Sequence, residues 1–390
     1  MAGEDLLGPG ALRSPGRTER DAASRRRQLY ALMGDLPDAS GTPKARKVSE
    51  DARDGYVLEK LELDINGLEP VPAFFAKPKN ATGALPTVLF NHSHGGGYDV
   101  GKTEFTEGRS YLQPTPYAKV ITDQGWAGLC IDTWVFGERS HTSELDMFKA
   151  MLWQGRVLWG MMVYDNLRAI DYLNSRDDVD SKRLATMGIS MGSTMSWWTA
   201  ALDERIKVTI DLCCLTEFHT LLQKNGLRGH GIYYYVPSLL KHFTTSDINA
   251  LIAPRPHLGV AGLQDALTPV EGLDIIDREM KKAYTEAGAP ENWRLLRYDV
   301  GHQETPEARE EAMNRLRHDI LDWRVRQDAA TALVGVLRWT GGGAPVRFYY
   351  LEDVGMGSTA HGAPRIQKHV FLCPKHQENC LLYTSDAADE

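Results

Sequence analysis

From about residue 55 the sequence alternates short β-rich runs with longer stretches of helical periodicity, and this rhythm restricts the folds open to the chain. Strands are expected over residues 56–63, 73–77, 87–91, 126–132, 183–188, 207–213, 257–262 and 293–298. Helices are expected near 112–123, in one long region containing residues 151–173, and from 306 to about 324. Strands that alternate with helices form a sheet covered on both faces. We therefore predict an α/β fold with a mostly parallel, twisted sheet of about eight strands.

The two ends of the chain depart from this rhythm. Residues 1–27 are rich in Gly, Pro, Arg and Ser, which predicts a mobile tail. Residues 326–390 are excluded from the predicted fold, because the rhythm stops there and the closing run 381–390 resembles a translated sequencing-library adapter. Residues 328–380 are open to two interpretations, a genuine extension or a shifted reading frame. The expected single domain spans residues 28–325.

Charge and cysteine content exclude several functional classes. The chain has 44 Lys and Arg against 52 Asp and Glu, a formal charge of -8, so nucleic acid is not an expected partner. There is no run of about 18 uncharged apolar residues, as a membrane-spanning helix would need. Five cysteines without C-x-x-C spacing argue against a disulfide framework or structural zinc. With no apolar signal segment at the start, these features predict a cytoplasmic location.

The sharpest local motif is the pentapeptide Gly188-Ile189-Ser190-Met191-Gly192. It lies between an expected strand and an expected helix, where such a turn lifts the central side chain clear of the sheet. Ser190 would then sit at a helix amino terminus, whose partial positive charge favours a developing anion. The motif alone is weak and a surface turn serine is the alternative, but its position predicts a nucleophile.

A serine nucleophile needs a histidine base and a carboxylate that orients the histidine. Asp265 follows the expected strand 257–262, and His302 follows the expected strand 293–298. All three residues thus come at carboxyl ends of strands, where open α/β sheets place ligands. Asp265 as a helix cap and His302 as a packed loop residue are the alternatives. Glu304 and Asp299 are rival acids but lie too close to His302 in sequence for the expected geometry.

The segment His92-Ser93-His94-Gly95-Gly96-Gly97, here called the glycine loop, follows the expected strand 87–91. Ester cleavage needs hydrogen-bond donors for the oxyanion, and backbone amides supply them. We predict Met191 N–H as one donor, with His94 or Gly95 as the first choice for another and Gly96 as the second. A metal held by His92 and His94 is the weaker alternative, because no third ligand has matching context.

These residues resemble the α/β-hydrolase superfamily, whose members carry serine, acid and histidine in this chain order together with such a glycine loop. Residues 28–325 are most similar to dienelactone-hydrolase-like and acetyl-xylan-esterase-like bacterial proteins, through segments 29–37, 132–139 and 231–237. Dienelactone hydrolase proper uses a cysteine where this chain has Ser190. The resemblance therefore implies hydrolase chemistry more specifically than it implies a substrate.

Residues 214–255 form an aromatic-rich insertion between two expected strands, which we expect to fold as a helical cap. Its Tyr233 and Tyr234, with Trp134 from the segment after another strand, are candidates for the substrate pocket. Core packing is the alternative for each ring.

The sequence as a whole predicts a serine hydrolase that cleaves a carboxylic ester, an acetyl ester or one with a similar small acyl group, through an acyl-enzyme. Two alternatives stay open: a serine peptidase of the prolyl-oligopeptidase type, and a non-catalytic binding protein on a hydrolase scaffold. No Walker loop or dinucleotide fingerprint occurs, so no cofactor and no metal is expected. The expected partner is a small ester; the oligomeric state is not predicted.

Overall fold

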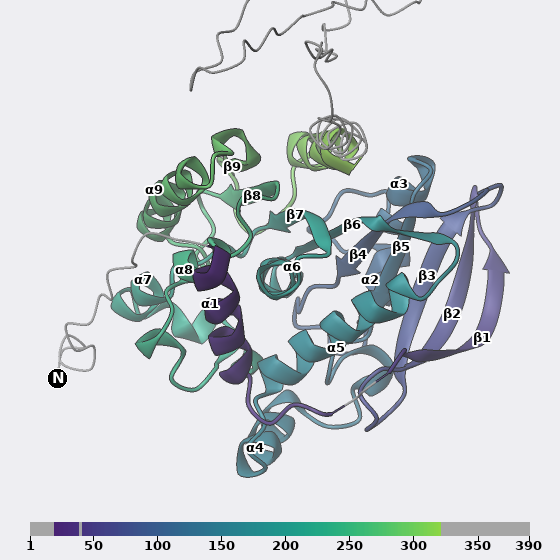
Figure 1. Ribbon diagram of the computed structural model, residues 1–390, viewed down its shortest axis with the longest axis horizontal. Helices are drawn as coiled ribbons and strands as arrows, with labels where there is room; N and C mark the ends of the chain where they lie inside the picture. The colour runs from purple at the N-terminus through teal and green to yellow at the C-terminus, as the bar shows by residue number, and fades with distance from the viewer. Residues whose placement is uncertain (1–18, 39–40, 321–390) are drawn as a thin grey trace, which may run out of the picture. The chain divides into compact units, whose positions relative to one another are not determined.

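The computed structural model describes residues 19–38 and 41–320, and in this part of the chain nine strands form one sheet (Figure 1). The expectations for residues 1–18 and for everything after residue 320 lie outside the described residues. The strands are β1 (Lys44–Ala52), β2 (Tyr56–Asp64), β3 (Val71–Pro78), β4 (Leu85–Asn91), β5 (Ala127–Ile131), β6 (Val179–Ile189), β7 (Ile206–Leu212), β8 (His257–Gly262) and β9 (Trp293–Tyr298).

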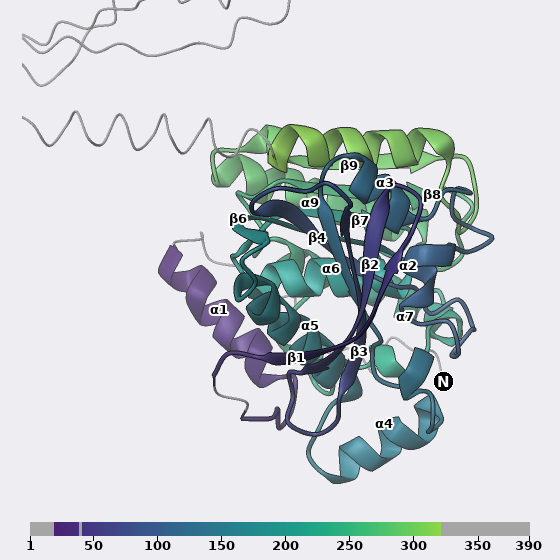
Figure 2. The same cartoon turned by 90° about the vertical axis from the view of Figure 1, so that its right-hand side faces the viewer.

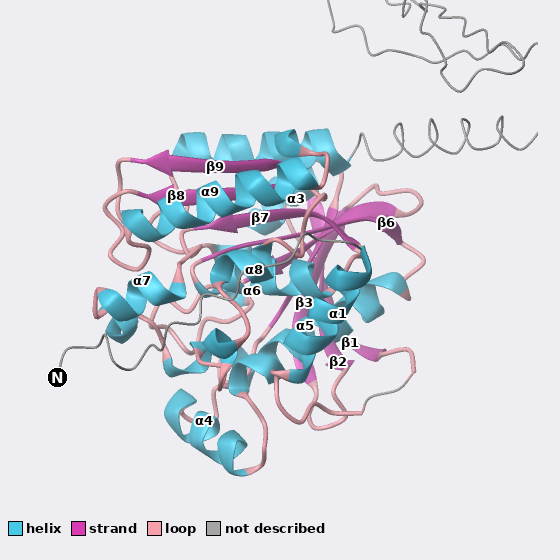
Figure 3. Cartoon of the chain, turned by 60° about the vertical axis from the view of Figure 1, so that its left-hand side comes forward, coloured by secondary structure: helices cyan, strands magenta, loops and turns pink. Residues whose placement is uncertain are grey.

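The sheet has the order β1-β2-β3-β5-β4-β6-β7-β8-β9. Its pairs from β5 through β9 are all parallel, whereas β1, β2 and β3 form an antiparallel edge that joins β5. Figure 3 shows β7, β8 and β9 side by side. The mostly parallel sheet is confirmed, and the carboxyl ends of β4, β6, β7, β8 and β9 lie along one edge.

Helices cover both faces of this sheet (Figure 2). They are α1 (Glu19–Ala31), α2 (Thr103–Glu107), α3 (Tyr117–Asp123), α4 (Glu144–Trp153), α5 (Leu158–Asn174), α6 (Met191–Leu202), α7 (Phe218–Gln223), α8 (Thr245–Asn249) and α9 (Val270–Glu286), with a further helix over residues 306–320. One core cluster packs α1, α5, α6 and α9 on one face, and a second packs α2, α3 and the helix 306–320 on the other. Successive residues of β5 alternate between the two clusters, as the two-residue repeat of a strand requires.

Three features differ from the sequence-based expectations. Strand β1 adds to the expected eight, and all its residues are exposed, so it carries no alternation of buried and exposed positions. The expected tail 1–27 overlaps α1, which is anchored because Arg26 donates to the carbonyls of Ala201 (3.0 Å) and Leu251 (2.8 Å). The expected long helical region is two helices, α4 and α5, which are separated at Gly155, with φ of 74°.

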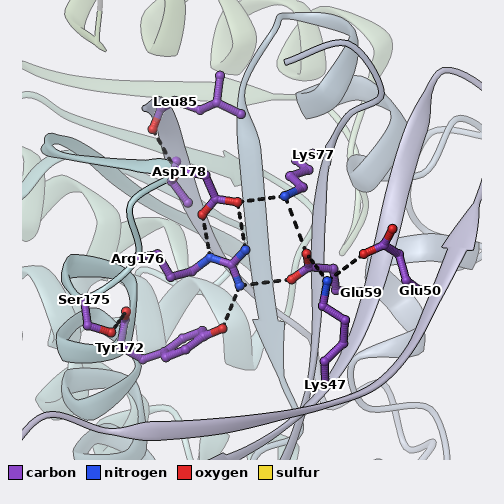
Figure 4. Close-up of polar contacts among 10 residues, drawn as sticks. Lys47, Glu50, Glu59, Lys77, Leu85, Tyr172, Ser175, Arg176 and Asp178 are labelled. Atoms are coloured by element: carbon purple, nitrogen blue, oxygen red, sulfur yellow. Dashed lines mark hydrogen bonds and ion pairs between the residues drawn. The ribbon is translucent and has the colours of Figure 1, made fainter. Parts of the chain in front are cut away.

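A network of ion pairs joins β1, β2 and β3 to the segment between α5 and β6 (Figure 4). The buried carboxylate of Glu59 accepts hydrogen bonds from Lys47 Nζ (2.9 Å) and Arg176 Nη1 (3.0 Å). Asp178 binds the same guanidinium (2.7 and 2.8 Å) and Lys77 Nζ (2.8 Å). Burial by itself would raise the pKa of Glu59, but these basic groups outweigh it and hold that pKa below its ordinary value. The network favours the ionised carboxylates.

Residues 214–255, here called the insertion, fold as short helical segments. Between α7 and α8 lie the 3₁₀ turns η3 (Gly226–Gly229), η4 (Ile232–Tyr234) and η5 (Leu239–Lys241). Elsewhere in the described residues, 3₁₀ turns occur at η2 (Gly137–Arg139) and η6 (Pro290–Asn292). None of the helices in the described ranges has the length and hydropathy needed to cross a membrane.

Candidate active site

Ser190 stands at the turn between β6 and α6, in the strained conformation that the sequence motif predicts. Its φ is 60° and its ψ is -122°, values that non-glycine residues rarely adopt. Its amide donates to Leu212 O (2.8 Å) and its carbonyl accepts from Thr194 N (3.2 Å), which fixes the turn on both sides. A Cβ on either flanking glycine, Gly188 or Gly192, would overlap with Asn91 O. The glycines are needed because the turn lies directly against β4.

Asp265 and His302 are brought together by the loops that follow β8 and β9. His302 Nδ1 lies 2.7 Å from Asp265 Oδ2, and the other carboxylate oxygen accepts from Leu267 N–H at 2.9 Å. The Asp265 side chain is 1% exposed and that of His302 is 25% exposed. A carboxylate accepts only, so His302 Nδ1 carries a hydrogen, and in the neutral ring Nε2 is the free base.

Close backbone packing holds these two loops against each other. A Cβ on Gly262, at the end of β8, would overlap with Gly301 O in the loop of His302. Leu263 N donates to Tyr298 O (2.8 Å), and Gln264 N donates to Val300 O (2.9 Å). The distance between the acid and the histidine is therefore set by main-chain contacts.

The two rival acids, Glu304 and Asp299, are hydrogen bonded to side chains other than His302. Glu304 is buried against Arg309, whose Nε and Nη2 donate to its two oxygens at 2.7 and 2.6 Å. Asp299 accepts from Gln264 Nε2 at 3.0 Å. Of the three acids, Asp265 is the one whose carboxylate is hydrogen bonded to His302.

The glycine loop turns sharply after β4, with Gly95 at φ 50° and Gly96 at φ 69°. Gly96 N–H donates to His94 Nδ1 (3.1 Å), and Gly97 N–H donates to His94 O (3.2 Å). Two of the loop amides are thus occupied within the loop. The second-choice oxyanion donor, Gly96, already has an acceptor.

The side chains of His92 and His94 do not share a site. His92 Nε2 accepts from Thr133 N–H (3.2 Å), and its Nδ1 donates to Ser93 O (3.0 Å); burial lowers the pKa of His92 to about 4. His94 Nε2 instead lies 3.3 Å from Glu144 Oε1. Within residues 19–38 and 41–320, no three histidine, cysteine or carboxylate side chains converge on a position for a metal ion.

The three aromatic pocket candidates are all largely buried. Tyr233 stacks on the ring of His94, with centroids 5.5 Å apart, and so lies beside the glycine loop. Tyr234 stacks on His230 at 4.8 Å. Trp134 packs beneath the Arg139 guanidinium, whose Cζ lies 4.3 Å from its ring centre. A role in the pocket stays a prediction for each of the three.

Sequence reasoning missed two groups beside this site. His230 of the insertion donates from Nε2 to Leu267 O (3.2 Å), on the residue whose amide binds Asp265, and burial lowers the pKa of His230. Glu104 and Arg109 contact the glycine loop, and burial raises the pKa of Glu104 to about 7. None of them belongs to a recognisable local motif, so only the fold reveals their position.

Comparison with known proteins identifies the family of this chain and the fold that it shares with solved structures. The profile of the Abhydrolase family matches residues 12–322. The Bacillus subtilis (strain 168) protein YtaP is 48% identical over 295 residues, covering 76% of this chain and 98% of its own. Among solved structures, a glucuronoyl esterase from Solibacter usitatus has a TM-score of 0.58 at 14% identity, covering 78% of this chain and 94% of that one. An acetyl xylan esterase from Paenibacillus sp. R4 has a TM-score of 0.51 at 19% identity, covering 77% and 92%.

Proposed function

This chain belongs to the α/β-hydrolase superfamily, and from that membership we propose that it hydrolyses a carboxylic ester through an acyl-enzyme on Ser190. The observation that carries the proposal is the Asp265–His302 hydrogen bond of 2.7 Å. It selects the tautomer in which Nδ1 carries the hydrogen and Nε2 can accept a proton, at the edge of the sheet where the strained serine turn stands.

In the proposed reaction Ser190 Oγ attacks the ester carbonyl while its proton passes to His302 Nε2. The tetrahedral intermediate collapses when the bond to the alcohol oxygen breaks, and the same proton goes to the leaving alcohol. Water then attacks the acyl group and gives a proton to His302, which returns it to Ser190 as the acid is released. Asp265 keeps the imidazole in the required tautomer and stabilises its charged form.

The oxyanion would be held by backbone amides. Met191 N–H belongs to the first turn of α6, where amides lack an intrahelical acceptor. Because Gly96 N–H is bound to His94 Nδ1, we place the second donor at the amide of His94 or Gly95. Two such donors would stabilise charge that exists only in the transition state.

We further propose an acetyl or similarly small acyl group. The support is the buried ring of Tyr233, which stacks on His94 and places a bulky side chain beside the glycine loop. Two of the solved structures that share the fold are named as esterases of a glucuronoyl group and of acetyl xylan, in keeping with ester substrates.

Turnover of nitrophenyl acetate tests the proposal. Wild-type protein should release nitrophenol, and Ser190→Ala should lose about 10⁴-fold or more in kcat. Ser193→Ala is the matched control, because this buried serine lies one turn along α6 and its hydroxyl faces Asp211 instead (3.4 Å). It should retain most of the turnover. Equal rates for wild type and Ser190→Ala would exclude Ser190 as the nucleophile.

A further inference from the structure

Glu104, Arg109 and Tyr111, which have no part in the proposed reaction, form a cluster that is hydrogen bonded to the glycine loop. Ser93 N–H donates to Glu104 Oε1 (3.0 Å), and the Ser93 hydroxyl is hydrogen bonded to Glu104 Oε2 and to the hydroxyl of Tyr111. Glu104, on α2, is 1% exposed. When its carboxylate is ionised, Glu104 can only accept, and in that form the order of donation runs from Tyr111 to Ser93 to Glu104.

Arg109 connects this cluster to the main chain of the loop. Its Nη2 donates to Gly95 O at 3.0 Å, and its Nη1 lies 3.9 Å from Glu104 Oε2. The guanidinium also lies over the ring of Tyr111, with Cζ 5.4 Å from the ring centre. Arg109 is thus the cation beside a buried carboxylate, and it donates to the loop carbonyl.

The exposed peptide between Gly95 and Gly96 is thus hydrogen bonded at both ends. Its carbonyl is bound by Arg109, and its amide is bound by His94 Nδ1 at 3.1 Å. Two glycines in the left-handed region would otherwise let this peptide plane rotate at little cost. A rotated plane would redirect the Gly95 carbonyl and displace the neighbouring Gly95 amide.

We propose that Arg109 is a positioning residue that holds the Gly95 carbonyl away from the acyl oxygen and so keeps the loop amide aimed at the oxyanion. This inference rests on the proposed ester hydrolysis. Arg109 acts through the main chain and touches no reacting atom. Its contribution grows as charge develops in the transition state, so its loss lowers kcat and leaves KM nearly unchanged.

Steady-state kinetics of Arg109→Met test this role. Removing an oxyanion donor outright typically costs about 10²–10³ in rate, so a misaligned donor should cost about tenfold to a hundredfold in kcat. The matched control is Arg315→Met, because Arg315 likewise donates to main-chain carbonyls, those of Glu291 (3.3 Å) and Asn292 (3.2 Å). The control should keep kcat within about twofold of wild type.

Two further measurements separate positioning from loss of structure. The rate of labelling by a fluorophosphonate, whose phosphoryl oxygen occupies the oxyanion position, should fall in parallel with kcat in folded Arg109→Met. Added guanidinium ion should restore part of the kcat of Arg109→Ala, whereas sodium ion should not; this second variant decides the matter if Arg109→Met does not fold.

The outcomes distinguish this inference from the proposed function. If wild type is active and Ser190→Ala is not, but folded Arg109→Met keeps kcat within about twofold, the positioning role is wrong and the ester hydrolysis stands. The positioning role is equally overturned if Arg109→Met changes KM alone, or if guanidinium restores nothing to Arg109→Ala. If wild type neither turns over esters nor reacts with the fluorophosphonate, the proposed function itself fails.

Discussion

Replacing Asp265 by asparagine changes one atom and tests how the acid and the histidine cooperate. Asp265 accepts from two donors, Leu267 N–H at 2.9 Å and His302 Nδ1 at 2.7 Å, and its side chain is almost fully buried. Asparagine offers a single acceptor oxygen. In one orientation of the asparagine amide, the NH₂ points at His302 and forces the tautomer whose Nε2 carries the hydrogen. In the opposite orientation, the NH₂ points at Leu267 N–H, so that two hydrogen-bond donors face each other.

The expected loss follows from these two contacts. A buried hydrogen bond to a charged group contributes about 1.5–3 kcal/mol, and leaving one buried donor unpaired costs about 1–3 kcal/mol. The sum, about 2.5–6 kcal/mol, corresponds to a fall of about 10²–10⁴ in kcat. The assay is nitrophenyl acetate turnover by Asp265→Asn, with circular dichroism to show that the variant is folded.

Asp299→Asn is the control for this prediction. Asp299 lies in the same loop as His302, but its carboxylate binds Gln264 Nε2 (3.0 Å) and not the imidazole. The control should keep kcat within about threefold of wild type. A folded Asp265→Asn with kcat within about threefold would refute the reasoning, because Asp265 would then have no part in orienting His302.

Three further predictions concern stability. The pKa of Glu59 is lowered in the folded protein, so its contribution to stability is fully present above its pKa in the unfolded chain and is lost as the pH falls through its pKa in the folded protein. Glu59→Gln should lower the free energy of unfolding in urea by about 2–4 kcal/mol at pH 7 and by less in acid. The control Glu50→Gln, at an exposed position, should lower it by about 0.5 kcal/mol or less. The pKa of Glu104 is raised to about 7, so the folded state binds its proton more tightly and wild-type stability should decline as the pH rises from about 4.5 to 7. Glu104→Gln should remove about 3 kcal/mol of this decline, and parallel pH profiles for the two proteins would contradict the burial argument. Gly192→Ala should lower stability by about 2–4 kcal/mol in thermal unfolding, since the new Cβ overlaps with Asn91 O; an unchanged melting temperature would mean that the turn can move away from β4.

The strands could be predicted from sequence where burial leaves a pattern. Strands β8 and β9 have the bounds expected from sequence: β8 is buried at every residue, and four of the six residues of β9 are aliphatic or aromatic. Strand β1 is exposed at every residue and paired on one side, so its composition is that of a charged edge and gives no strand signal. Helix α1 escaped prediction because its arginines bind carbonyls far along the chain.

In the candidate active site too, local sequence predicts some features, whereas others arise only when the chain folds. The serine turn is a local event, so five consecutive residues suffice to predict it, and the structure places Ser190 at the expected strand-to-helix junction. Arg109 and Glu104 look like ordinary polar residues in the sequence, and their importance arises only when the chain folds back over Gly95. The occupied amide of Gly96 likewise depends on the conformation of His94, which composition and spacing do not fix.

Mass spectrometry after reaction with a fluorophosphonate tests the central claim most directly, because the reagent modifies a serine only when base and oxyanion donors are in place. We predict one adduct per chain, located on the peptide that contains Ser190, and no adduct on Ser190→Ala. An unmodified wild-type protein that still hydrolyses esters, or an adduct located on a different residue, would contradict Ser190 as the nucleophile.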